Sequence, residues 1–169
     1  MLEVAKCLQW VGVDEKLRPS RISLDNPCPR DWSGACFDPR SMADRSRIDA
    51  LEARTAQFAI DIVLLVRHAR TQPELRPACE QLNASAGSVA ANHRAAGRSR
   101  STKEFAAKLQ IVHEEADESA HWLSQLKATS RDAAINVRIE KALREAIELR
   151  NIFGRARSTT RARYFAEKT

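Results

Sequence analysis

Glycine is scarce in this sequence, with only 5 in 169 residues, whereas alanine is abundant. This balance disfavours strand-rich folds and the glycine loops that bind nucleotides, and it favours helices. No apolar run approaches the roughly 18 residues of a membrane span, and the longest, Ile62 to Val66, has five. The four cysteines have no pairing or zinc-binding spacing, and no basic-then-apolar signal peptide is recognisable. We therefore predict a reduced, cytoplasmic protein without a membrane span.

Motifs that would indicate catalysis are also missing. The sequence has no Gly-x-Ser-x-Gly, phosphate loop or Gly-x-Gly-x-x-Gly. Glu118-x-x-His121 matches half of a di-iron bundle motif, but no second Glu-x-x-His accompanies it. The stretch beginning at His113 resembles a zinc-protease helix only until Asp117, which stands where the second His is required. We expect no enzymatic activity, no catalytic residue, no metal and no cofactor, and we interpret the acidic block Glu114 to Glu118 as a salt-bridged face.

The first 41 residues differ in composition from the rest. They hold four of the six prolines and three of the four cysteines, and no helical or strand periodicity lasts beyond a few residues. Cys7, Cys28 and Cys36 lack the fourth ligand and the close spacing of a zinc site. We predict an irregular or disordered leader over residues 1–41, and we hypothesise that it lies upstream of a true start at Met42.

From Met42 onward, apolar and small residues repeat in alternating steps of three and four, which is typical of amphipathic helices. Four such stripes run from Ile48 to Ala69, Leu75 to Ala96, Phe105 to Leu126 and Ile135 to Ala156. Stripes of similar length joined by short links predict an all-α, antiparallel, up-down-up-down four-helix bundle over residues 42–157. A basic C-terminal tail would follow over residues 158–169.

Local signals place the helix ends. Pro73 ends the first helix, Pro77 lies in the first turn of the second, and Gly97 ends the second. Ser101 with Glu104 fits a capping box, in which the hydroxyl accepts from a backbone N–H and the carboxylate reaches back. The link between the third and fourth helices is predicted near residues 129–132.

Some apolar residues lie off the four stripes. A single bundle does not need to bury all of them, so a second apolar face indicates oligomerisation or partner binding, unless they are scattered surface residues. These residues are Ile60, Val63, Ile111, Trp122, Leu143 and Ile147.

Two helices carry a specific resemblance. The run from Asn92 to Ala96 is Asn-His-Arg-Ala-Ala, and it is followed by Arg98-Ser99, Glu104-Phe105 and the block Glu114 to Glu118. At this spacing the sequence resembles a bacterial four-helix-bundle family first recognised as reading frames in 23S rRNA intervening sequences. The resemblance covers roughly residues 46–156. The chain departs from the commoner pattern where Ala95-Ala96 replaces Glu-Gly.

The resemblance implies a small antiparallel bundle that assembles into a ring-like homopentamer. It further implies similarity to the accessory proteins of diversity-generating retroelements, which are basic pentamers that engage nucleic acid and a reverse transcriptase. No enzymatic activity is attached to the family.

Basic residues are concentrated in two segments, residues 67–108 and residues 150–169. The chain has 28 Lys and Arg against 22 Asp and Glu, a net charge of +6. In an up-down bundle, the turn between helices two and three and the end of helix four lie at the same end, so their basic residues would form one phosphate-binding surface. The predicted nucleic-acid contacts are Arg94, Arg98, Arg100, Lys103, Arg155, Arg157, Arg161 and Arg163. The alternative is ordinary solvation with salt bridges to the acidic block.

Two further residues have structural interpretations. Asn92, on the small-residue stripe, is predicted to be a buried polar group that fixes helix register. Cys79 is predicted to be a small core residue. The leading functional hypothesis is a non-enzymatic homo-oligomeric scaffold, a pentamer by resemblance, that contacts RNA or DNA. Its rival is a protein-interaction scaffold without nucleic-acid binding.

Overall fold

The computed structural model describes the chain over residues 39–166, and the side chains over residues 45–162. Four long helices make up this part: α2 (Pro39–Ala69), α3 (Arg76–Ala96), α4 (Thr102–Thr129) and α5 (Ala133–Ala166). A single 3-10 turn, η1 (Pro73–Leu75), leads into α3. No strand occurs between residues 39 and 166.

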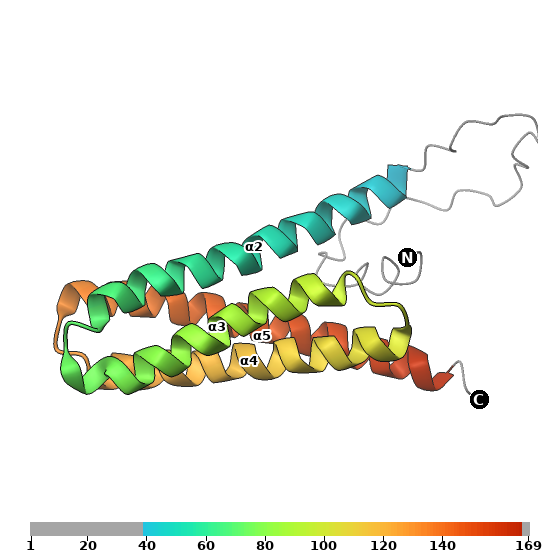
Figure 1. Ribbon diagram of the computed structural model, residues 1–169. Coiled ribbons are helices and arrows are strands. Elements are labelled where there is room, and N and C mark those ends of the chain that lie inside the picture. The colour runs from blue at the N-terminus through green and yellow to red at the C-terminus, as the bar shows by residue number, and fades with distance from the viewer. Residues whose placement is uncertain (1–38, 167–169) are drawn as a thin grey trace, which may run out of the picture.

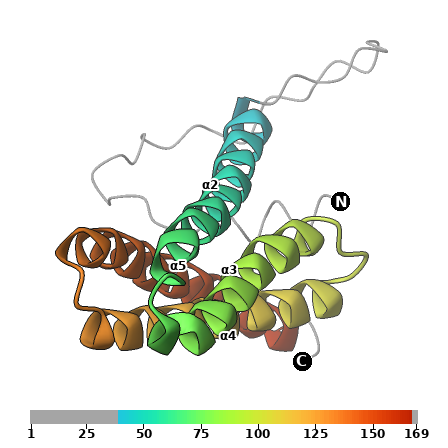
Figure 2. The same cartoon turned by 60° about the vertical axis from the view of Figure 1, so that its left-hand side comes forward.

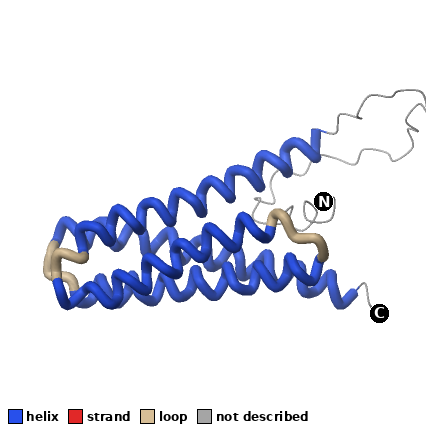
Figure 3. The backbone as a smooth tube through the Cα atoms, in the orientation of Figure 1, coloured by secondary structure: helices blue, strands red, loops and turns tan. Residues whose placement is uncertain are grey.

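The helices form an antiparallel bundle, as the sequence predicted. Short connections join successive helices at alternate ends, with the α2–α3 and α4–α5 links at one end and the α3–α4 turn at the other (Figure 3). Helices α3, α4 and α5 run side by side, whereas α2 diverges from them toward its N-terminal end (Figures 1 and 2).

The four predicted stripes form the core. Every member of the α3 and α4 stripes is buried, and in α5 only Ala142 is partly exposed. The α2 stripe is buried from Thr55 to Ala69, but Ile48 and Leu51 are only half-buried because this part of α2 diverges. Cys79 is fully buried, which confirms its predicted place in the core. Burying large side chains is worth about 1.5–3 kcal/mol each, so this core supplies most of the driving force for folding.

The capping signals act largely as predicted. The Ser101 hydroxyl accepts from the Glu104 N–H at 3.1 Å. The Glu104 carboxylate reaches back one residue further than a capping box requires, to the N–H of Arg100 at 3.0 Å. Asp132, which the sequence analysis did not single out, caps α5 by accepting from the N–H groups of Ala134 and Ile135.

Two predicted boundaries differ from the structure. Helix α2 begins at Pro39 rather than Met42, because proline is well suited to the first helical position. Helix α5 continues through Gly154 to Ala166, so the bundle helix extends beyond the predicted boundary at residue 157 and includes most of the predicted basic tail. One glycine costs only about 1 kcal/mol in a long helix. The remainder of the predicted leader, and the question of a start at Met42, lie outside the described residues.

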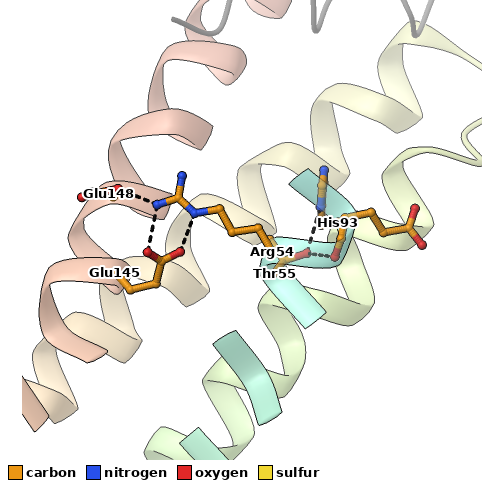
Figure 4. Close-up of polar contacts among 6 residues, drawn as sticks. Arg54, Thr55, His93, Glu145 and Glu148 are labelled. Carbon is orange, nitrogen blue, oxygen red and sulfur yellow. Dashed lines mark hydrogen bonds and ion pairs between the residues drawn. The ribbon is translucent and has the colours of Figure 1, made fainter. Parts of the chain in front are cut away.

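A cluster of ion pairs, the Arg54 cluster, joins α2 to α5. The Arg54 guanidinium donates to both carboxylate oxygens of Glu145, at 2.6 and 2.9 Å, and also to Glu148 (Figure 4). The hydrogen bond to Glu145 is the main cause that raises the pKa of Arg54. Bidentate geometry makes this pair stronger than an ordinary surface ion pair.

Candidate nucleic-acid interface

The structure brings the two predicted basic segments to one end of the bundle. The α3–α4 turn and the C-terminal part of α5 lie at the same end in Figure 1. The short antiparallel links explain this arrangement, because they return each helix alongside the one before it.

The basic residues of the turn are exposed. Arg98 and Lys103 form no ion pair with a described residue. Arg94 lies 3.6 Å from Glu52, and Arg100 lies 3.7 Å from Glu104 with 92% of its side chain exposed. Such exposed pairs contribute at most about 1 kcal/mol, so both guanidinium groups can exchange a carboxylate for a phosphate at little cost.

The basic residues of α5 divide into two kinds. Arg155 and Arg161 are exposed. Arg157 is half-buried and donates to the side-chain oxygen of Gln110 at 3.0 Å, which fastens α5 to α4. Arg163 lies in α5 beyond the described side chains. The α5 contribution to a phosphate-binding surface therefore rests on Arg155 and Arg161.

Asn92 is not the buried polar residue that the sequence predicted. It is half-buried, donates to the backbone and hydroxyl oxygens of Ser88, and accepts from the Lys108 ammonium at 3.3 Å. The next residue, His93, takes the core position instead, with 5% of its surface exposed. Because the α3 stripe already passes through His93, Asn92 is rotated toward the α4 side.

His93 belongs to the core rather than to a ligand site. Its Nδ1 lies 3.1 Å from the Thr55 hydroxyl (Figure 4), and its ring meets Phe153 edge-on at 4.9 Å. Burial lowers the pKa of His93 to about 4. The ring is therefore uncharged at neutral pH and adds nothing to the basic surface.

A groove that the sequence analysis missed lies between α4 and α5. Its volume is about 570 Å³, and its lining includes His113, Arg150, Gly154 and Arg155. A Cβ atom at Gly154 would lie 3.2 Å from the His113 ring, so the glycine admits the imidazole against α5. In the sequence, the only signal was a glycine that a long helix does not otherwise need.

The acidic block of α4 makes the contacts expected of a polar face. Arg150 of α5 donates to Asp117 at 2.9 Å, the Trp122 indole donates to Glu118 at 2.9 Å, and Gln110 donates to Glu114. Among residues 39–166, no cluster of three or more His, Cys, Asp or Glu is placed to hold a metal ion. In the same part of the chain, no helix combines the length and apolarity of a membrane span.

Comparison with known proteins returned no matching family model, no matching curated protein and no matching solved structure. The resemblance to the 23S rRNA intervening-sequence family thus rests on the residues quoted from this sequence and remains a prediction.

Proposed function

We propose that this chain is a non-enzymatic, homo-oligomeric four-helix-bundle protein of the 23S rRNA intervening-sequence type that binds RNA or DNA through the phosphate backbone. The observation that carries the proposal is the exposure of Arg98, Arg100 and Lys103 at the α3–α4 turn, which lies at the end of the bundle that the C-terminal part of α5 also reaches. Arginine forks form charge-assisted bonds to phosphate oxygens, and each neutralised phosphate releases counterions.

The mechanism is electrostatic capture multiplied by subunit number. One exposed basic end binds phosphates weakly, but several ends held in one assembly raise the effective concentration of each site for the same nucleic acid. Aromatic side chains that could stack bases are few, at 5% of the sequence. The proposal is therefore recognition of backbone and shape rather than of base sequence.

An oligomer is supported by apolar side chains that the single bundle leaves in solvent. Ile60, Val63 and Leu64 of α2 are 51%, 53% and 41% exposed, and Val137 of α5 is 71% exposed. Of the other predicted off-stripe residues, Trp122, Leu143 and Ile147 are half-buried against the core, and Ile111 is half-buried. We propose a homo-oligomer in the cytoplasm, with a pentamer as the first expectation, and a reverse transcriptase as one class of protein partner.

The experiment is a binding series with the full chain. Fluorescence anisotropy of labelled structured RNA and duplex DNA would be measured from 50 to 300 mM salt, with each preparation sized by light scattering. Affinity should fall steeply with salt, and Arg98→Glu/Arg100→Glu should weaken binding without changing size. The matched control is Arg131→Glu/Arg144→Glu, which reverses the same number of exposed charges away from the basic end.

The second candidate function is a protein-interaction scaffold that binds no nucleic acid. The exposed apolar side chains of α2 favour it, because they suit protein docking without phosphate chemistry. No nucleic-acid binding by an intact assembly at 50 mM salt would contradict the leading proposal and favour this one.

A further inference from the structure

The groove between α4 and α5 has a specific set of polar groups. Asn151, Arg155 and Ser158 follow one another at steps of four and three, so they share one face of α5. His113 of α4 and Gly154 of α5 meet within the groove. The groove lies part-way along α4, at His113, and the C-terminal part of α5 continues from it to the end of the bundle where the α3–α4 turn lies.

One group of side chains in the groove supplies hydrogen-bond donors. Asn151 and Arg155 are exposed and present amide and guanidinium N–H groups. Arg150 uses one nitrogen to bind Asp117 at 2.9 Å, which keeps its guanidinium beside α4. This combination of positive charge and planar donors suits phosphate oxygens.

A second group supplies acceptors. The Ser158 hydroxyl donates to the Gly154 carbonyl at 3.0 Å, and the Thr159 hydroxyl donates to the Arg155 carbonyl at 3.0 Å. A hydroxyl has one proton, so both oxygens have only lone pairs left for a ligand.

The His113 ring adds a further hydrogen-bond acceptor to the groove. Its Nδ1 lies 3.1 Å from the Arg150 carbonyl oxygen. A carbonyl oxygen can only accept, so Nδ1 carries the proton, and Nε2 is the acceptor of the uncharged ring.

We propose that this groove binds the ribose-phosphate backbone of single-stranded RNA, an inference that rests on the proposed function and narrows it to one nucleic acid. Arg155 and Asn151 donate to phosphate oxygens. The ribose 2′-hydroxyl, a donor that DNA lacks, donates to His113 Nε2 or to the hydroxyl oxygen of Ser158 or Thr159. A groove of about 570 Å³ has room for a nucleotide or two.

The test compares oligo(U) with oligo(dU) of equal length, both labelled, by anisotropy with the full chain. The native protein should bind oligo(U) roughly fivefold more tightly, the value of one net hydrogen bond. Arg155→Gln should weaken both ligands and reduce the salt slope by about 0.7, the single-strand value for one phosphate. Arg144→Gln, an exposed change elsewhere on α5, should leave both affinities unchanged.

Two variants separate RNA selectivity from affinity. His113→Phe and, independently, the exposed Ser158→Ala should lower the preference for oligo(U) while binding of oligo(dU) persists. Ser158→Ala keeps the test valid if His113→Phe destabilises the bundle, and thermal melting would show this. Equal binding of both ligands by the native protein, with Arg155→Gln unchanged, overturns the groove assignment but leaves the proposed function standing. No binding of any nucleic acid overturns the proposed function itself.

Discussion

The Thr55 hydroxyl on α2 and the His93 ring on α3 form a buried polar contact of 3.1 Å within the core. The same hydroxyl donates its proton to the Glu52 carbonyl at 2.9 Å. His93 Nδ1 must therefore be the donor in the contact, which fixes the tautomer of the uncharged ring. This contact ties the diverging α2 to α3 near the basic end of the bundle.

The first prediction concerns acid stability. Burial lowers the pKa of His93 to about 4, whereas the unfolded chain titrates near 6.5. Between these values the unfolded state binds more protons, so stability must fall as the pH drops from about 6.5 through 4. For this one group, the free energy of unfolding should decrease by about 2 kcal/mol between pH 7.5 and pH 5. Urea titrations at both pH values would measure it.

The control for acid stability is His93→Leu. Leucine does not titrate, and the Thr55 hydroxyl keeps its bond to the Glu52 carbonyl. The pH dependence of the variant should therefore be smaller by the same amount, because carboxylates and the other histidines titrate in both proteins. An identical pH dependence in both would show that His93 is not buried in its uncharged form.

The second prediction concerns the Arg54 cluster of ion pairs between α2 and α5. Arg54→Ala should cost about 1 kcal/mol, since the pair is bidentate but about one-third exposed and screened by solvent. The loss should shrink in high salt. Hydrogen exchange should quicken in the diverging part of α2, whose side chains are only partly buried. Arg144→Ala, which removes an exposed pair to Glu140 within α5, should cost less than about 0.5 kcal/mol.

The bundle was predictable from sequence because the residues that each helix buries recur at a regular spacing. From Leu75 to Ala96, the stripe contains Ser85 and His93 among small and apolar residues, and all seven positions are buried. A helix buries a stripe whatever its members, so spacing alone locates the core. The prediction for Asn92 was wrong because it departed from this spacing, which passes through the neighbouring His93 and leaves Asn92 half-buried beside the core.

The candidate site was predictable only in part. Chain topology places Arg98 and the C-terminal part of α5 at the same end, and short links are enough to deduce that. The groove at His113 depends on the closeness of α4 and α5 around Gly154, which no spacing within one helix reveals. The engagement of Arg157 by Gln110 is likewise a contact between helices that the sequence does not signal.

The third prediction concerns a pair of buried hydroxyls. Ser85 Oγ and Ser119 Oγ lie 2.9 Å apart, and Ser119 also donates to the Glu115 carbonyl. Removing one hydroxyl takes away the other's partner across the two helices and leaves it only its backbone acceptor, the Leu82 carbonyl for Ser85 or the Glu115 carbonyl for Ser119. Alanine at both positions removes the polar groups together. Ser85→Ala/Ser119→Ala should therefore be less destabilising than the sum of the single changes by about 1 kcal/mol. Additive losses in urea unfolding would contradict a coupled pair.

The fourth prediction concerns assembly. Ile60 and Val63 are about half exposed on one face of α2, so carboxylates there cost the isolated bundle little. In an assembly that covers this face, the same carboxylates would be desolvated without partners, which is strongly unfavourable. Ile60→Asp/Val63→Asp should therefore lower the mass seen by light scattering toward that of one 19.0 kDa chain, with unchanged helical circular dichroism.

The matched control for assembly is Gln81→Asp/Ala84→Asp, which places two carboxylates at the same spacing on an exposed face of α3. It should leave the mass of the assembly unchanged. Loss of assembly should also weaken nucleic-acid binding at moderate salt, because each separated bundle keeps its basic end but loses multivalency. If the α2 variant retains the mass of the native protein, the α2 face is not the subunit interface. If the mass instead falls and binding persists, a single basic end is sufficient for it.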